Sequence, residues 1–121
     1  MGVFALGAAA AEAAMHPELG AKLSGMGEHG IVNLQSNATK GQLCWTFTIS
    51  TMHLTGASIR DSAGMVVAKL GSAFKAKSCA SAATKVLDLI ESKPSSYTVW
   101  LDTKGHPGDL RGKLFVGMAN M

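Results

Sequence analysis

The chain has 121 residues, which is the size of one domain and excludes a two-domain enzyme. Hydrophobic residues make up 47% and charged residues 16%, so the chain can form a core and is not expected to be disordered. The formal net charge is +3, and the bases are spread along the chain instead of forming a concentrated basic arm. This distribution does not favour a nucleic-acid-binding protein.

The N-terminal segment, residues 1–18, opens with an uncharged run of small and apolar residues from Gly2 to Ala11. This run resembles the apolar region of a secretory signal, although no base precedes Lys22. An alanine-rich helix that stays in the mature protein is the alternative. With about ten residues the run is too short to cross a bilayer, which needs about 20, and we expect no transmembrane span elsewhere.

Short strands separated by turns are expected along most of the remaining chain. The strongest strand signal covers residues 42–50, where apolar side chains alternate with Cys44 and hydroxyl-bearing side chains. One face of this strand should therefore lie on the core, and the other should face outward. A Gly/Pro turn is expected at 103–109. The other predicted strands are residues 20–25, 30–37, 56–61, 65–70, 97–102 and 110–117.

One helix is expected at about residues 81–92, where apolar residues recur at helical spacing. Ser81 can serve as its N-cap, and Pro94 ends it. The sequence therefore predicts a mainly β fold. We expect an antiparallel β-sandwich or Greek-key barrel of about seven strands with this one short helix.

The chain has two cysteines, Cys44 and Cys79, without a CxxC motif or a Cys/His cluster. A disulfide between them is the simpler interpretation. Because Cys44 is expected on the outer face of its strand, the bridge would connect that face to the segment around Cys79. Two buried free thiols in a reducing compartment are the alternative.

Several segments occur in an order typical of one family: LSG, KGQLCWTFTIS, GASIRDSAGMVVAKLG, FKAKSCA and YTVWLDTKGHPGDLRGKLF. Together, from about Leu19 to Phe115, they resemble the CHRD domain, which is named for its occurrence in chordin. The most specific part is HPGDLRGKL, which is similar to the family ending P-G-G-E-I-R-G-Q-L. The CW pair and the later cysteine resemble the two-cysteine bacterial subgroup. The resemblance implies a β-sandwich module of a secreted or envelope protein, with the CHRD-like domain at 19–117 and a C-terminal tail at 118–121.

The chain departs from the histidine-bearing family strands A-H-I-H and V-N-V-H, which resemble those of copper/zinc superoxide dismutases. The corresponding segments here are 57–60 and 99–102, and neither contains histidine. A metal enzyme on this scaffold is therefore not expected. We hypothesise instead a structural ion pair between Arg60 and Asp102, with separate solvent exposure of the two side chains as the alternative.

The remaining candidate residues have structural interpretations. Asp109 and Arg111 lie on the same side of the chain, so Arg111 is expected to anchor the loop there, with ligand binding as the alternative. Trp45 and Trp100 are expected to pack in the core or on a sheet face, with a binding platform as the alternative. The four histidines, His16, His29, His53 and His106, do not have the spacing of metal ligands and are expected in solvent. Among the methionines, which could bind copper(I), only Met118 and Met121 form an MxxM pair.

These patterns predict a non-enzymatic secreted or cell-envelope module with a structural, adhesive or protein-interaction role. No catalytic, cofactor-binding or metal-binding residue is assigned. The expected partners are other proteins, envelope or matrix components, or further copies of the chain. A degenerate superoxide-dismutase-like protein with weak copper or zinc binding is the alternative, and an intracellular binding domain with free thiols is a third.

Overall fold

The computed structural model describes residues 18–25, 28–49, 54–103 and 106–119, and the side chains of residues 106–109 are outside the description. Within these ranges the chain forms nine strands, one α-helix and one short 3-10 helix. In chain order the elements are β1 (Glu18–Gly25), β2 (Glu28–Asn37), β3 (Gln42–Ile49), β4 (Leu54–Arg60), β5 (Val66–Lys69), β6 (Lys77–Ser81), α2 (Thr84–Ser92), η1 (Pro94–Ser96), β7 (Thr98–Thr103), β8 (His106–Lys113) and β9 (Phe115–Val116).

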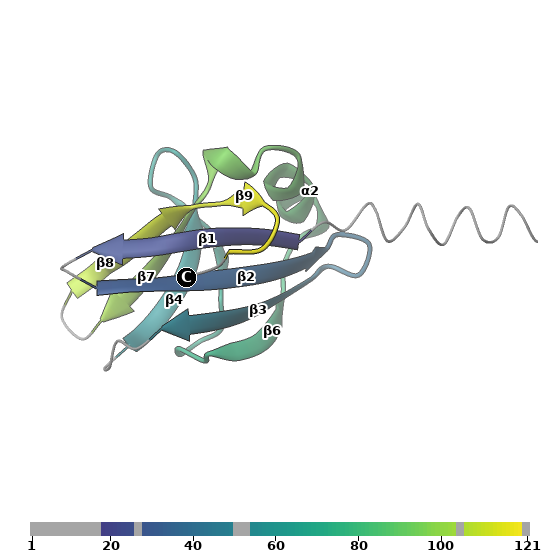
Figure 1. The fold of residues 1–121 in the computed structure, drawn as a ribbon. Coiled ribbons are helices and arrows are strands. Elements are labelled where there is room, and N and C mark those ends of the chain that lie inside the picture. Colours follow the sequence, from purple (N-terminus) through teal and green to yellow (C-terminus); the bar gives the residue numbers. More distant parts are fainter. Residues whose placement is uncertain (1–17, 26–27, 50–53, 104–105, 120–121) are drawn as a thin grey trace, which may run out of the picture.

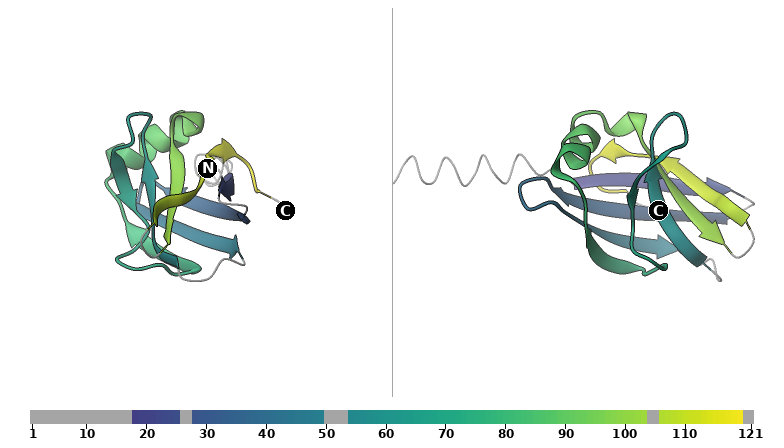
Figure 2. Two further views of the ribbon diagram at one scale, coloured as in Figure 1. Left: turned by 90° about the vertical axis from the view of Figure 1, so that its left-hand side faces the viewer. Right: turned by 180° about the vertical axis from the view of Figure 1, so that it is seen from behind.

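The strands form one curved antiparallel sheet in the order β5-β4-β7-β8-β1-β2-β3-β6, and β9 pairs with β1 (Figures 1 and 2). Residues 70–76 connect the edge strands β5 and β6. Along this connection the Leu70 N–H donates to the Ala57 oxygen of β4 at 3.0 Å, and the Phe47 N–H of β3 donates to the Ala76 oxygen at 2.6 Å. These bonds nearly close the sheet into a barrel, which confirms the predicted mainly β antiparallel fold.

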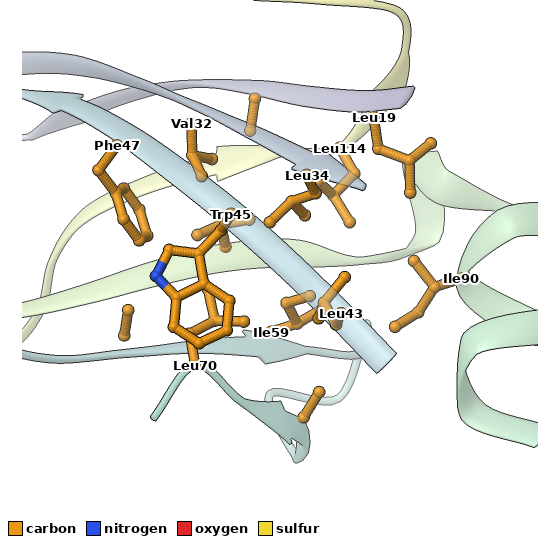
Figure 3. Close-up of a cluster of buried hydrophobic side chains, with 14 of the residues drawn as sticks. Leu19, Val32, Leu34, Leu43, Trp45, Phe47, Ile59, Leu70, Ile90 and Leu114 are labelled. Atoms are coloured by element: carbon orange, nitrogen blue, oxygen red, sulfur yellow. The ribbon is translucent and has the colours of Figure 1, made fainter. Parts of the chain in front are cut away.

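The hydrophobic core fills the inside of this barrel. On β3 the side chains of Leu43, Trp45 and Phe47 are buried, whereas Thr46 on the opposite face is exposed, as the alternation predicted. The indole Nε1–H of Trp45 donates to the Lys75 oxygen at 2.9 Å, so the buried nitrogen is satisfied and the 70–76 connection is held against the core. Figure 3 shows these side chains converging with others from several strands.

The segment around residue 81 differs from the prediction. Lys77–Ser81 is strand β6, paired with β3, and the helix begins only at Thr84. The predicted N-cap role of Ser81 is wrong, because Ala83 occupies the cap position and makes no side-chain cap bond. The short, polar KSCAS segment carries no apolar alternation, and its strand conformation depends on the pairing with β3. Strand β8 likewise begins at His106, within the segment predicted as a turn.

Helix α2 covers one end of the barrel (Figure 1) and buries Leu87 and Ile90. A polar contact adds to this packing: the fully buried Ser36 Oγ of β2 donates to Glu91 Oε2 at 2.6 Å. A hydrogen bond to a charged group contributes about 1.5–3 kcal/mol. The contact therefore holds the helix in place against β2.

Replacing Ser36 by alanine is expected to lower the free energy of unfolding by about 1.5 kcal/mol, because the bond to the Glu91 carboxylate is lost. Urea unfolding followed by circular dichroism measures this change. Ser92→Ala is the matched control, since its hydroxyl donates to the Leu89 oxygen on the exposed side of the same helix. A loss no larger for Ser36→Ala than for the control would show that the buried bond contributes nothing.

The C-terminal residues continue along β1. Strand β9 pairs Phe115 with Gly20, and Ala119 then packs over Gly20, where a Cβ would come within 2.7 Å of the Ala119 nitrogen. The Asn33 side chain holds this residue: the Ala119 N–H donates to Asn33 Oδ1 at 2.7 Å, and Asn33 Nδ2 donates to the Ala119 oxygen at 3.4 Å. The predicted tail at 118–121 therefore includes a buried residue of the domain, because Ala119 is 3% exposed. The predicted N-terminal segment lies outside the described residues except for Glu18, which begins β1.

Candidate functional site

A group of cationic and aromatic side chains lies on the outer face of β4, β7 and β8. Trp100 of β7 is flanked by Arg60 of β4 and Arg111 of β8, and we call these three residues the Arg–Trp–Arg stack. The guanidinium Cζ atoms of Arg60 and Arg111 lie 4.1 Å and 4.0 Å from the centroid of the indole ring. Both distances are well within the range of about 6 Å for cation–π attraction.

Strand alternation and pairing register bring these side chains together. Ile59, Leu101 and Leu110 are fully buried, so their neighbours in each strand point outward. Trp100 lies directly opposite Arg111 on β8 and opposite Ser58 on β4. Arg60 is on the same face of β4 as Ser58, two residues further along, and extends back over the indole.

The register extends this arrangement into a row across five adjacent strands. Lys69 of β5 pairs with Ser58, Ser58 with Trp100, Trp100 with Arg111, and Arg111 with Ser24 of β1. We call these five residues the cross-strand row. With about 4.8 Å between neighbouring strands, the Lys69 and Arg111 backbones are about 14 Å apart. Lys69, Arg111 and Ser24 are exposed, whereas Ser58 is buried and Trp100 is half-buried, so the row is open to a partner at Lys69 and from Arg111 to Ser24.

Among the described side chains, positive charge exceeds negative charge on this face. Beside the cross-strand row, Arg60 lies opposite Thr98, which lies opposite the exposed Lys113. Bases thus occupy both sides of Trp100, on β4 and β5 and on β8. Like charges placed this closely attract anions and repel other cations.

Two acidic side chains among those described lie near the stack, Asp61 and Asp102. Asp61 is part of the turn after β4, where its Oδ1 accepts hydrogen bonds from the Ala63 N–H at 2.9 Å and the Met65 N–H at 3.0 Å. Asp102 lies opposite Gly56, on the other side of the cross-strand row from Arg60. Among the side chains that the structure describes, four bases (Arg60, Lys69, Arg111, Lys113) share this face with Asp61 and Asp102, and the Asp61 carboxylate is bonded within a turn.

The contacts of Arg60 bear on its predicted ion pair with Asp102. Its Nη1 donates to the Gly64 oxygen at 3.2 Å, and its Nε donates to Ser58 Oγ at 3.4 Å. Arg60 pairs in register with Thr98, whereas Asp102 pairs with Gly56, four positions earlier on β4. These contacts assign the Arg60 guanidinium to Trp100 and the β4–β5 turn. The ion pair with Asp102 stays a prediction that they do not support.

Two hollows with hydroxyl-bearing walls flank the stack. The hollow beside Arg60 has a volume of about 600 Å³ and extends toward β6, and the hollow beside Arg111 has a volume of about 460 Å³ and extends toward η1. The hydroxyl residues of the first are Thr55, Ser58, Ser72 and Ser81, and those of the second are Ser62, Ser95, Ser96 and Thr98. Hydroxyls both donate and accept hydrogen bonds, so these walls suit a ligand that is itself rich in hydroxyl groups.

The residues that were predicted as a structural loop lie in strand β8. Arg111 is exposed and extends over Trp100, so its position is on a sheet face and not in a loop. The Asp109 side chain lies outside the described residues. Trp100 packs on the outer sheet face and Trp45 in the core, which agrees with the packing roles expected for both tryptophans.

The predicted disulfide between Cys44 and Cys79 is present. The two residues lie directly opposite each other on β3 and β6, on the outer face of the sheet, as expected for Cys44. Two free thiols, the alternative, are therefore wrong for this structure. A largely apolar hollow of about 470 Å³ lies over the bridge and is bordered by Met118.

The described residues contain no group of three or more His, Cys, Asp or Glu side chains that could hold a metal ion. His29 is exposed on β2, as expected for a solvated histidine. His16, His53 and Met121 lie outside the described residues, as does the side chain of His106. Nor is any helix in the described ranges long and apolar enough to cross a membrane.

Sequence reasoning identified the residues of the stack singly but did not bring them together. Alternation in the segments SIR, VWLD and DLRGK places Arg60, Trp100 and Arg111 on outward faces, which is a signal that the sequence contains. Their convergence depends on β7 lying between β4 and β8, a strand order that alternation does not specify. The comparisons add no assignment, because no protein-family model, curated protein or solved structure matches the chain.

Proposed function

We propose that the protein is an extracytoplasmic, non-enzymatic interaction module that binds components of a cell envelope or extracellular matrix. The observation that carries this proposal is the Arg–Trp–Arg stack on an outward face of the barrel. Arginine and tryptophan are the residues most enriched at energetically important positions of protein interfaces. A surface where both lie together, with Lys69 and Lys113 beside them, suits binding to an anionic partner.

The position of the stack on paired strands supports a binding role. Trp100 lies on β7, which is hydrogen-bonded to β4 on one side and to β8 on the other. The opposite face of the same strand buries Val99 and Leu101 in the core. Side chains on such rigid elements lose little conformational freedom when a partner binds, so more of the interaction energy becomes affinity.

The extracytoplasmic location is supported by the Cys44–Cys79 disulfide, since disulfides persist in oxidising compartments and are rare in the cytosol. The CHRD resemblance points in the same direction. A mainly β fold with a disulfide agrees with what that resemblance implies, and membership of the family is part of the proposal.

The proposal is tested by co-sedimentation of the oxidised protein with insoluble envelope or matrix material from its source. Arg111→Glu reverses the charge at the centre of the face, and it is expected to lower the bound fraction at least about fivefold at moderate ionic strength. Lys85→Glu is the matched control, because it makes the same charge change at an exposed position on α2. The control variant should sediment like the wild type.

Equal losses for the two variants would show that binding depends on net charge alone and would contradict a specific face. Sedimentation of Arg111→Glu at the wild-type level would contradict the proposal directly. Both variants are first compared with the wild type by circular dichroism and thermal unfolding, so that a folding defect is not read as lost binding.

A further inference from the structure

The cross-strand row has the shape of a site for an extended chain. Lys69, Ser58, Trp100, Arg111 and Ser24 come from five consecutive strands and lie on a line perpendicular to them. Positive charge extends along this row from Lys69 at the β5 end to Arg111 in the fourth position, and Arg60 and Arg111 meet over Trp100 between them. Such a line fits a linear polymer with repeated anionic groups better than a single small anion.

The Arg60 guanidinium keeps donors for such a polymer. A guanidinium carries five N–H donors, and the described hydrogen bonds of Arg60 use two of them, one to Ser58 and one to Gly64. Contact with the indole restrains this guanidinium. A guanidinium presents its N–H groups in fork geometry. This geometry matches the paired oxygens of a carboxylate, sulfate or phosphate group.

The covered indole argues against recognition by stacking. Proteins that bind single-stranded nucleic acids use exposed aromatic faces, on which successive bases lie. Here Arg60 and Arg111 both lie over the Trp100 ring, about 4 Å from its centroid. The indole thus orients the two guanidinium groups, and it is these groups that face a ligand.

The flanking hollows indicate the chemistry of the rest of the polymer. Serine and threonine hydroxyls line both, together with Lys69 and Asp102 in one hollow and Lys113 and Asp61 in the other. A polymer that carries hydroxyl groups between its anionic groups would find partners for both along this face. Sugar chains with carboxylate or sulfate substituents have this composition.

From these observations we propose that a linear anionic polysaccharide, bearing carboxylate or sulfate groups, binds across the strands along the cross-strand row. Arg60 and Arg111 hold its anionic groups, Lys69 and Lys113 extend the positive surface, and the hydroxyls of the two hollows contact the sugars. This inference rests on the proposed function and names the partner class for the same face.

The test is isothermal titration calorimetry with size-defined oligosaccharides at low and moderate salt. The probes are heparin fragments as sulfated chains, oligogalacturonates as carboxylated chains, dextran oligosaccharides as neutral chains, and single- and double-stranded DNA of equal charge. At least one anionic oligosaccharide is expected to bind more tightly than either DNA and than the neutral chain. The affinity should fall as salt rises, since exposed charges are screened.

The double variant Arg60→Gln and Arg111→Gln is expected to lower the affinity for the anionic oligosaccharide at least about tenfold, because two charge-assisted contacts are lost. Lys85→Gln with Lys93→Gln removes two charges from exposed positions at the helix and is the matched control, with less than about a twofold effect. Should the arginine variant fail to fold, Lys69→Gln with Lys113→Gln changes only exposed side chains of the same face and should lower the affinity about threefold or more.

Several results would overturn the inference. Tighter binding of either DNA would show that the face prefers a nucleic acid to a polysaccharide. Equal binding of neutral and anionic oligosaccharides would show that charge does not contribute to recognition. If no anionic oligosaccharide binds but the protein still sediments with envelope or matrix material in an Arg111-dependent manner, the polysaccharide is rejected and the proposed function stands. Loss of that sedimentation as well would reject both.

Discussion

Replacing Gly112 by alanine is expected to lower the free energy of unfolding by about 3 kcal/mol, which is a large part of the 5–15 kcal/mol of a typical domain. Gly112 lies on β8 opposite Val99, where β8 runs against β1. A Cβ at this position would overlap the backbone carbonyl of Lys22 and come within 3.3 Å of Leu23 Cδ2. Because the overlapping atoms belong to the backbone of a paired strand, they cannot move aside without disturbing the sheet.

The matched control is Gly56→Ala on β4. A Cβ there would meet only the Oδ2 atom of Asp102, at 3.7 Å, which is an ordinary van der Waals contact. We expect a change within about 0.5 kcal/mol for this variant. Urea unfolding followed by circular dichroism compares the two glycines, and a similar small effect at both would show that β1 and β8 do not approach as closely as the structure indicates.

The sequence predicted those parts of the fold that depend on local pattern. In β3 the alternation of Leu43, Trp45 and Phe47 with small polar residues is strong enough to specify both the strand and its buried face. The outward position of Cys44 followed from the same alternation, and the bridge to Cys79 is where it was expected. For these residues the interaction that decides the conformation is burial of every second side chain, which a single strand already encodes.

Other parts depend on contacts between distant segments and could not be predicted in this way. Lys77–Ser81 has little apolar character, and it becomes a strand because β3 provides hydrogen bonds and a disulfide along its length. The same reason explains the helix start, since a segment already used in β6 cannot also provide the N-cap at Ser81. Tertiary pairing outweighs local propensity at both positions.

The candidate site shows the same limit. The hypothesis for Arg60 assumed a carboxylate partner at Asp102, whereas the structure places its guanidinium over Trp100, from the neighbouring strand. Both interpretations require an outward-facing arginine, which the alternation supplies. Trp100 and Asp102 both lie on β7, so it is the pairing register that distinguishes them: Trp100 lies opposite Ser58, two positions from Arg60, and Asp102 lies opposite Gly56, four positions away. This register is set between strands and cannot be deduced from alternation within one strand.

Removing the disulfide is expected to have the largest effect on stability. Replacing both Cys44 and Cys79 by alanine should lower the free energy of unfolding by about 4 kcal/mol, because the bridge closes a separation of 35 residues in the unfolded chain. The closed segment includes β4, β5 and the 70–76 connection, which are the parts that complete the barrel between its two edges. Urea unfolding of the oxidised wild type and the double variant measures the difference.

Reduction provides the control for this prediction. Dithiothreitol should shift the unfolding midpoint of the wild type toward that of the double variant and leave the double variant unchanged. The far-ultraviolet circular dichroism of the variant under native conditions should match that of the wild type, because hydrogen bonding between β3 and β6 does not require the bridge. Equal unfolding midpoints for the oxidised wild type and the variant would mean that the bridge adds little to stability. The hydrogen bonds between β3 and β6, together with those of the 70–76 connection to β3 and β4, would then already restrain the segment.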